Sequence, residues 1–185
     1  MGCMQAKQRT DKQEGNQDAQ GVNGNNRPAT FNEKLFRTVD YRLLTNTYTI
    51  SPTVLGAGNF GKVFLAHHNI NSEFKVAVKT MQKKKIGENL QKLKQEIKIL
   101  SKLDHPNICK YYETYESPKH VYLVMEYCGG GDLFDKITSQ KDGTLFSETK
   151  AASIMKKLFL GINHCHSNGV IHRDLKPENI MYKDM

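Results

Sequence analysis

The polypeptide has 185 residues, of which 38% are hydrophobic, and it carries a formal net charge of +8 at pH 7. This length suits one domain, with or without a tail, and the apolar content is enough for a buried core. The four cysteines are isolated, and neither a secretory signal peptide nor an apolar run of transmembrane length is visible, so the sequence predicts a cytoplasmic, reducing setting without a disulfide framework or a zinc site.

Much of the positive charge belongs to lysines between residues 83 and 102. They are Lys83, Lys84, Lys85, Lys92, Lys94, Lys98 and Lys102. A protein that binds single-stranded nucleic acid places aromatic side chains among such lysines, and this stretch of sequence contains none. We therefore interpret the lysines as the solvated face of a helix and expect no nucleic acid among the partners.

Residues 1–45 are predicted to form a disordered N-terminal tail. Residues 1–30 are rich in Gln, Asn and Gly and contain almost no large apolar side chains, so they cannot bury enough surface to offset their chain entropy. Apolar residues between 31 and 44 have a roughly helical spacing, which is compatible with a segment docked on the domain surface. The folded domain is predicted to occupy residues 46–185.

The first residues of the tail, Met1-Gly2-Cys3, are typical of a lipid anchor. Gly2 is placed for myristoylation and Cys3 for palmitoylation, and basic residues follow closely. Two acyl chains, or one chain with basic charge, hold a protein stably on a membrane, whereas one chain alone binds marginally. Ala6 departs from the pattern, which has Ser or Thr there, so the alternative is an unmodified tail. The lipid interpretation predicts association with the inner leaflet of a membrane.

The domain begins with three strand patterns, at residues 48–55, 63–66 and 76–78. A turn with three glycines, residues 56–62, separates the first two. Such glycines also mark dinucleotide-binding loops, but there a helix follows them. Here a strand pattern resumes at Val63, so the sequence predicts a strand-turn-strand hairpin whose backbone amides can approach phosphates.

Lys79 ends the third strand. An ammonium so close to a core is unfavourable unless it is paired. Apolar residues three and four apart predict the next helix from about Gly87 to Lys102, with Glu96 on its inner side. The sequence therefore predicts a Lys79–Glu96 ion pair that holds the lysine against nucleotide phosphates, with a surface pair between Glu96 and Lys92 as the alternative.

Two further strands are predicted at residues 108–115 and 121–125, and the second opens into a glycine-rich stretch. A long helix follows, with Ser147 as its N-cap and Asn168-Gly169 as its end. Five strands with one helix, followed mainly by helices, indicate a two-lobed α+β fold.

A charged segment comes directly after this helix. It is Ile171-His172-Arg173-Asp174-Leu175-Lys176-Pro177-Glu178-Asn179. The segment resembles the catalytic loop of a protein kinase, in which the Asp accepts the proton of the substrate hydroxyl and the Asn five residues later holds a magnesium ion. The alternative is a solvated charged turn.

Together these motifs resemble a eukaryotic protein kinase domain from about Tyr48 to Asp184. The resemblance is strongest to calcium-dependent and calmodulin-dependent protein kinases, through Leu103-Asp104-His105-Pro106-Asn107-Ile108 and Gly130-Gly131-Asp132-Leu133-Phe134. It implies a complete N-lobe of five antiparallel strands and one helix at residues 46–126, and the first part of a helical C-lobe at residues 127–185.

The resemblance also implies ATP and Mg²⁺ as cofactors. The residues it assigns to ATP binding are Leu55, Gly56, Ala57, Gly58, Asn59, Phe60, Gly61, Val63, Ala77, Lys79, Glu96, Met125, Glu126, Cys128 and Asp132. The residues it assigns to catalysis are Asp174, Lys176 and Asn179, with Asn179 as the magnesium ligand. Lys176 matches kinases that act on protein Ser and Thr. Asp132 and Glu178 match positions that receive basic residues upstream of the acceptor.

Kinases of this family continue past the catalytic loop with Asp-Phe-Gly, an activation segment and further helices. The sequence stops at residue 185, so we expect a kinase fragment that is inactive by itself, in which calcium could act only through segments absent from this sequence. The alternatives are a catalytically inactive ATP-binding module and a membrane-tethered interaction protein. The presence of Lys79, Glu96, Asp174 and Asn179 together favours the enzyme.

Overall fold

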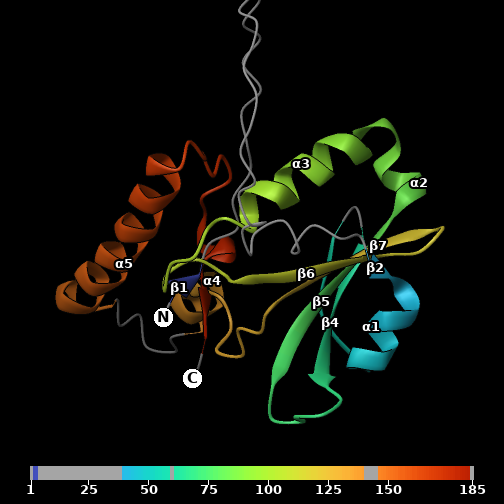
Figure 1. Cartoon of the computed structure of the whole chain (residues 1–185). Coiled ribbons are helices and arrows are strands. Elements are labelled where there is room, and N and C mark those ends of the chain that lie inside the picture. Colours follow the sequence, from blue (N-terminus) through green and yellow to red (C-terminus); the bar gives the residue numbers. More distant parts are fainter. Residues whose placement is uncertain (1, 4–38, 59–60, 140–145, 184–185) are drawn as a thin grey trace, which may run out of the picture.

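The computed structural model describes residues 2–3, 39–58, 61–139 and 146–183 (Figure 1). The strands are β1 (Gly2–Cys3), β2 (Val39–Asp40), β3 (Tyr48–Gly58), β4 (Gly61–His68), β5 (Lys75–Gln82), β6 (Tyr111–Glu116), β7 (His120–Glu126) and β8 (Met181–Tyr182). The helices are α1 (Tyr41–Thr47), α2 (Lys83–Ile86), η2 (Gly87–Asn89), α3 (Leu90–Leu100), α4 (Leu133–Thr138), α5 (Glu148–Ser167) and η3 (Pro177–Asn179).

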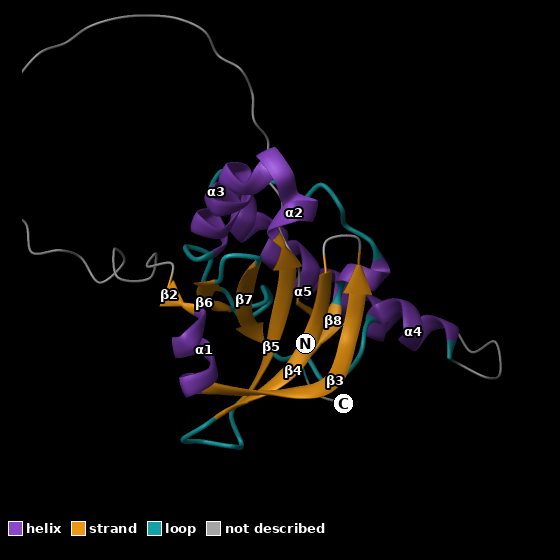
Figure 2. Ribbon diagram, turned by 90° about the vertical axis from the view of Figure 1, so that its right-hand side faces the viewer, coloured by secondary structure: helices purple, strands orange, loops and turns teal. Residues whose placement is uncertain are grey.

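A six-stranded sheet in the order β2-β6-β7-β5-β4-β3 builds the first lobe (Figure 2). The strands from β3 to β7 pair antiparallel with their neighbours, which confirms the predicted five-stranded sheet. The short strand β2 adds a parallel partner at the β6 edge, which the sequence did not predict.

The two faces of this sheet are covered by different helices. Successive side chains of a strand point to opposite faces of the sheet. On β5, Val76 and Val78 therefore lie on one face, and Lys79 and Met81 lie on the other. The first face carries a buried cluster of Leu44, Tyr48, Ala66, Val76, Val78, Tyr115 and Val124. The second carries a buried cluster of Met81, Ile86, Ile97, Tyr111, Val121 and Leu123, to which α3 contributes Ile97.

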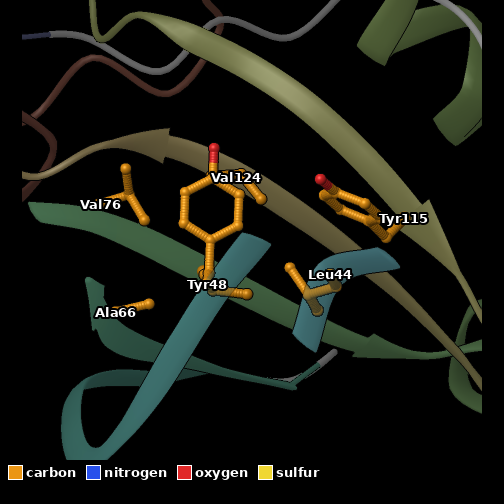
Figure 3. Close-up of a cluster of buried hydrophobic side chains, with 7 residues drawn as sticks. Leu44, Tyr48, Ala66, Val76, Tyr115 and Val124 are labelled. Atoms are coloured by element: carbon orange, nitrogen blue, oxygen red, sulfur yellow. The ribbon is translucent and has the colours of Figure 1, made fainter. Parts of the chain in front are cut away.

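Helix α1 belongs to the folded domain, although the sequence analysis placed residues up to 45 in the tail. Leu44 is 0% exposed and packs beside Tyr48 in the first cluster (Figure 3). Asp40 caps the helix by accepting a hydrogen bond from the N–H of Arg42 at 3.0 Å. At the other end, the side chain of Asn69 donates to the carbonyls of Thr45 and Asn46. The domain therefore starts before residue 46, because α1 buries Leu44 in the core and the backbone groups at both ends of the helix have hydrogen-bond partners.

The helix predicted from about Gly87 to Lys102 is observed as the turn η2 followed by α3, and the short helix α2 before it was not predicted. Residues 83–86 form α2, and Gly87 follows with a φ of +56°, a left-handed conformation that suits glycine. The turn η2 then leads into α3, which ends at Leu100. The glycine thus separates the basic turn from the helix that carries Glu96.

The second lobe is organised by α5. Ser147 caps it by accepting from the N–H of Lys150 at 3.3 Å, and Gly169 ends it with a φ of +70°, so both predicted ends are confirmed. Buried Leu103, Ile108, Cys165 and Val170 join the segment before β6 to this helix. Within the described part of the chain, no helix has the length and apolarity needed to cross a bilayer.

The predicted tail lies mainly in residues 4–38, outside the described residues. Of its first residues, Gly2 and Cys3 form β1, which pairs antiparallel with β8. Gly2 stands opposite Tyr182, and Cys3 stands opposite Met181.

Candidate active site

The charged loop after α5, residues 171–179, is anchored in the protein interior by buried residues at its start. Val170 and His172 are 2% and 4% exposed. The N–H of Asp174 donates to Nδ1 of His172 at 3.3 Å, so the buried imidazole fixes the turn that brings the Asp174 carboxylate to the surface. Arg173 between them has a φ of +64°, a conformation that is costly for a residue with a Cβ and that concentrates at functional sites.

Asp174, Lys176 and Asn179, the three residues that the sequence assigns to catalysis, lie close together. Nδ2 of Asn179 donates to the backbone carbonyl of Asp174 at 2.7 Å and to its carboxylate Oδ2 at 3.0 Å. Nζ of Lys176 lies 3.8 Å from Oδ1 of the same carboxylate. The carboxylate is half-exposed, with an ammonium beside one oxygen and an amide on the other. This arrangement orients a carboxylate toward solvent, where it can accept a proton.

The loop's far end is tied to the segment that follows the sheet. The N–H of Leu133 donates to the carbonyl of buried Ile180 at 2.8 Å, and the N–H of Tyr182 donates to the carbonyl of Gly131, also at 2.8 Å. Nζ of Lys183 pairs with a carboxylate oxygen of Glu126 at 2.9 Å. The loop is thereby fixed to the residues that connect the two lobes.

The glycine-rich turn is a hairpin between β3 and β4, as predicted. Gly56 pairs with Val63, and Gly58 pairs with Gly61, while Asn59 and Phe60 lie outside the described residues. A Cβ at Gly61 would meet the carbonyl oxygen of Thr80 at 1.7 Å, so the neighbouring strand excludes any side chain there. At Gly56 and Gly58 the corresponding space is open. The first two glycines therefore leave the backbone accessible from outside, and the third is required for packing.

Four of the predicted nucleotide-binding residues lie on the sheet as two directly opposed pairs. Lys79 on β5 pairs with Val63 on β4, and Ala77 on β5 pairs with Met125 on β7. Directly opposed residues share a face, and so do residues two apart, so these four side chains lie on one face of the sheet. Leu55 on β3 is 40% exposed.

The predicted ion pair of Lys79 with Glu96 does not appear among the described residues. Glu96 is half-buried on α3, and the structure assigns it no ion pair with Lys79 or with Lys92. Instead, Lys94 of the same helix binds Glu116 at 3.4 Å. The spacing of Glu96 among apolar residues predicts which side of α3 carries it. That spacing contains no information on the distance between α3 and β5, on which the ion pair depends.

The segment between the lobes makes a contact that the sequence did not predict. The thiol of Cys109 donates to the carbonyl of Glu126 at 3.6 Å, and the N–H of Glu126 donates to the carbonyl of Lys110 at 2.8 Å. Cys128 follows two residues later and is partly buried. Cys109 and Glu126 are 17 positions apart in the sequence, and no local pattern around Cys109 indicates that the two residues are neighbours.

Asp132 serves as a helix cap. Its Oδ1 accepts a hydrogen bond from the N–H of Asp135 at 2.7 Å at the start of α4. One carboxylate oxygen is thus engaged within the protein. Glu178 is exposed on η3. A carboxylate at each position could meet a basic side chain of another molecule.

The residues present suit a magnesium nucleotide. Because Nδ2 of Asn179 is bound to Asp174, the side-chain carbonyl Oδ1 is the atom left for a hard cation, and Mg²⁺ prefers such oxygen ligands. The open backbone at Gly56 and Gly58 suits phosphate groups, which backbone amides can approach there.

Comparisons with known proteins agree with this geometry. The family model described as protein kinase domain matches residues 50–185. Calcium-dependent protein kinase 5 of Plasmodium falciparum is 48% identical over 141 residues, which are 76% of this chain and 24% of that protein. Calcium/calmodulin-dependent protein kinase type 1 of Caenorhabditis elegans is 42% identical over 129 residues, covering 70% and 36% of the two chains.

Among solved structures, that of Rad53 residues 1–466 in complex with AMP-PNP matches with a TM-score of 0.67 and 32% identity. The match covers 76% of this chain and 36% of the Rad53 chain. The chain thus spans about a quarter to a third of the relatives named above.

Proposed function

This chain belongs to the protein kinase domain family, and from that premise we propose that it carries the ATP site and the catalytic loop of a serine/threonine protein kinase. The reaction is transfer of the γ-phosphate of ATP to the hydroxyl of a protein Ser or Thr. The observation that carries the proposal is the convergence of Lys176 and Asn179 on the carboxylate of Asp174.

In this reaction Asp174 accepts the proton of the attacking hydroxyl and orients it. Asn179 holds the carboxylate through Nδ2 and offers Oδ1 to a magnesium ion, and Lys176 places positive charge where negative charge builds up on the transferred group. Bound Mg²⁺ neutralises phosphate charge. Phosphoryl transfer depends mainly on positioning and electrostatics. The loop therefore contributes to the rate by holding Asp174, Lys176 and Asn179 in a fixed arrangement.

On the other side of the site, the amides of the glycine hairpin contact the phosphates, and Lys79 holds the α- and β-phosphates. We propose that Glu96 pairs with Lys79 in the nucleotide-bound state. The segment from Met125 through Cys128 offers backbone groups to the adenine edge. Support for ATP as the nucleotide comes from family membership and from the open backbone at Gly56 and Gly58.

For the substrate, we propose Ser or Thr preceded by basic residues. Exposed Glu178 and the second oxygen of Asp132 supply the carboxylates that an upstream arginine would meet. We further propose that acylated Gly2 and Cys3 attach the protein to a membrane surface. That part rests on the sequence Met1-Gly2-Cys3.

The test uses the full-length product of the gene. It is incubated with ATP labelled at the γ-phosphate and three peptides: one with Arg upstream of Ser, one with Ala in place of Arg, and one with Tyr in place of Ser. We expect labelling of the first, weaker labelling of the second and none of the third. Labelling of none of them, or of the Tyr peptide alone, would contradict the proposed function.

A further inference from the structure

Glu116, the last residue of β6, binds two lysines from two different helices. Its carboxylate pairs with Lys83 of α2 and, at 3.4 Å, with Nζ of Lys94 of α3. The side chains of Glu116 and Lys83 are only 18% and 23% exposed, so these charges are largely shielded from water. Exposed ion pairs contribute little to stability, and partly buried ones are worth more because they are less screened.

One lysine directly follows, and the other belongs to, an element that carries a proposed nucleotide contact. Lys83 stands four residues after Lys79, on the continuation of β5, and Lys94 stands two residues before Glu96 on α3. One carboxylate therefore links the end of the strand that carries Lys79 to the helix that carries Glu96.

The carboxylate is itself held in a rigid position. The backbone of Glu116 pairs with Val121 of β7 on one side and with Asp40 of β2 on the other. Helix α3 also packs on the sheet through apolar side chains, which include Ile97 and partly buried Leu93. Apolar contacts are not directional, so they allow the helix to slide, whereas an ion pair fixes one point of it.

The charge on Glu116 is maintained at neutral pH. Burial alone would raise the pKa of its carboxyl group, but hydrogen bonding and attraction from Lys83 and Lys94 outweigh burial and hold that pKa below its ordinary value. The two ammonium groups are therefore bridged by a full negative charge.

We propose that Glu116 is a positioning residue, which holds α3 close enough to the sheet for Glu96 to reach Lys79 when ATP is bound. This inference rests on the proposed function. Without the carboxylate, the ammonium groups of Lys83 and Lys94 face each other with no anion between them. Their repulsion moves α3 away from β6, and with it Glu96 away from Lys79.

The experiment measures ATP binding by isothermal titration calorimetry, in the presence of Mg²⁺, with the wild-type protein and five variants. They are Glu116→Gln, Glu116→Asp, Lys94→Met, the double variant of Glu116→Gln with Lys94→Met, and the control Lys92→Met. Lys92 is exposed on the same helix and forms no ion pair with any residue that the structure describes.

We expect Glu116→Gln and Lys94→Met each to weaken ATP binding about fivefold, and the double variant to bind about as weakly as either. Glu116→Asp, which keeps the charge on a shorter side chain, should fall between wild type and Glu116→Gln. Lys92→Met should match wild type. Unchanged affinity in Glu116→Gln, or fully additive losses in the double variant, would overturn the proposal.

Hydrogen exchange on the same proteins separates this inference from the proposed function. Amides of α3 should exchange faster in Glu116→Gln and Lys94→Met, while those of α5 stay unchanged, which distinguishes a local release from general unfolding. If the wild-type protein binds no ATP, the proposed function fails, and faster exchange confined to α3 still supports the link between β6 and α3. Unchanged exchange in α3 would refute that link as well.

Discussion

Asn179 donates from one nitrogen to two oxygens of Asp174, the backbone carbonyl at 2.7 Å and the carboxylate at 3.0 Å. One amide group thus fixes both the backbone and the side chain of the proposed base. Asn179 lies on the single turn η3, whose neighbour Ile180 is buried, so the loop itself holds this geometry.

The first prediction concerns this base. Asp174→Asn should lower the rate of phosphotransfer by about 10²–10⁴-fold, the usual contribution of a general acid–base group, because an amide cannot accept the hydroxyl proton. ATP affinity should stay at the wild-type level, since Asp174 orients the hydroxyl and does not grip the nucleotide. Transfer of labelled γ-phosphate and calorimetric ATP titration measure the two quantities. A variant that phosphorylates at the wild-type rate would remove Asp174 from the mechanism.

The second prediction concerns Lys79 and Glu96, between which the described part of the structure shows no ion pair. Lys79→Met and Glu96→Ala should each weaken ATP binding by about 1–2 kcal/mol, and the double variant should lose little more, because both side chains serve one pair in the nucleotide complex. Lys75→Met is the matched control, since Lys75 is exposed at the start of the same strand. Additive losses would show that the two residues act independently.

The third prediction separates two glycines of the hairpin. Gly61→Ala should destabilise the protein by about 3 kcal/mol, because its Cβ would collide with the backbone of Thr80. Gly58→Ala should change stability by less than about 1 kcal/mol, since the space beside it is open, yet it should weaken ATP binding by filling the space that the phosphates need. Urea unfolding and ATP titration provide the readouts. The reverse order of stabilities would contradict the packing described here.

The fourth prediction concerns pH. The ring of His105 stacks on that of His164 with centroids 5.1 Å apart, and Nδ1 of His105 accepts the N–H of Asn107. Burial, and then the neighbouring ring of His164, lower the pKa of His105 below 6.5. The unfolded chain therefore binds a proton more readily than the folded one, and this contribution to stability is present above pH 6.5 and is lost as the pH falls below it.

The measurement is urea unfolding at pH 7.5 and at pH 5.5. His105→Asn keeps a side-chain acceptor for the N–H of Asn107 but cannot titrate, so its loss of stability on acidification should be smaller than that of the wild type. Equal losses in both proteins would mean that His105 does not contribute to the acid sensitivity.

The fifth prediction concerns the N-terminus. A fusion of residues 1–30 to a fluorescent protein should lie on membranes, Gly2→Ala should release it completely, and Cys3→Ser should release part of it, because one myristoyl chain binds with a constant of only about 10⁴ M⁻¹. Fluorescence microscopy gives the distribution, and mass spectrometry of the N-terminal peptide identifies the acyl groups. An unmodified Gly2 with a cytosolic wild-type fusion would end the membrane hypothesis.

Local signals in the sequence were enough for much of the fold. Ser147 and Gly169 mark the two ends of α5 because capping and left-handed φ depend on the residues at the ends themselves. The short spacing of Asp174 and Asn179 marked both residues as members of one loop, and the structure adds the hydrogen bonds between them. These features depend on short stretches of sequence.

Features that depend on contacts between distant residues were missed. Helix α1 has only seven residues, and its stability comes from Leu44 in the core rather than from its own length. Asp40 as a cap, with Tyr41, Leu44 and Tyr48 at helical spacing, was the signal that could have revealed it. The position of α3 relative to the sheet could not be predicted either. It depends on the ion pair of Lys94 with Glu116, and these two residues are more than twenty positions apart in the sequence.

The burial of Leu44 also determines where this domain can be separated from whatever precedes it. A protein cut at residue 46 would lose a side chain that is 0% exposed, and the surrounding Ala66, Val78 and Val124 would line a cavity. Loss of a buried leucine costs about 2–5 kcal/mol, a large part of the stability of a small domain. A cut that preserves folding therefore lies before Val39, so that β2 and α1 stay attached to the kinase domain.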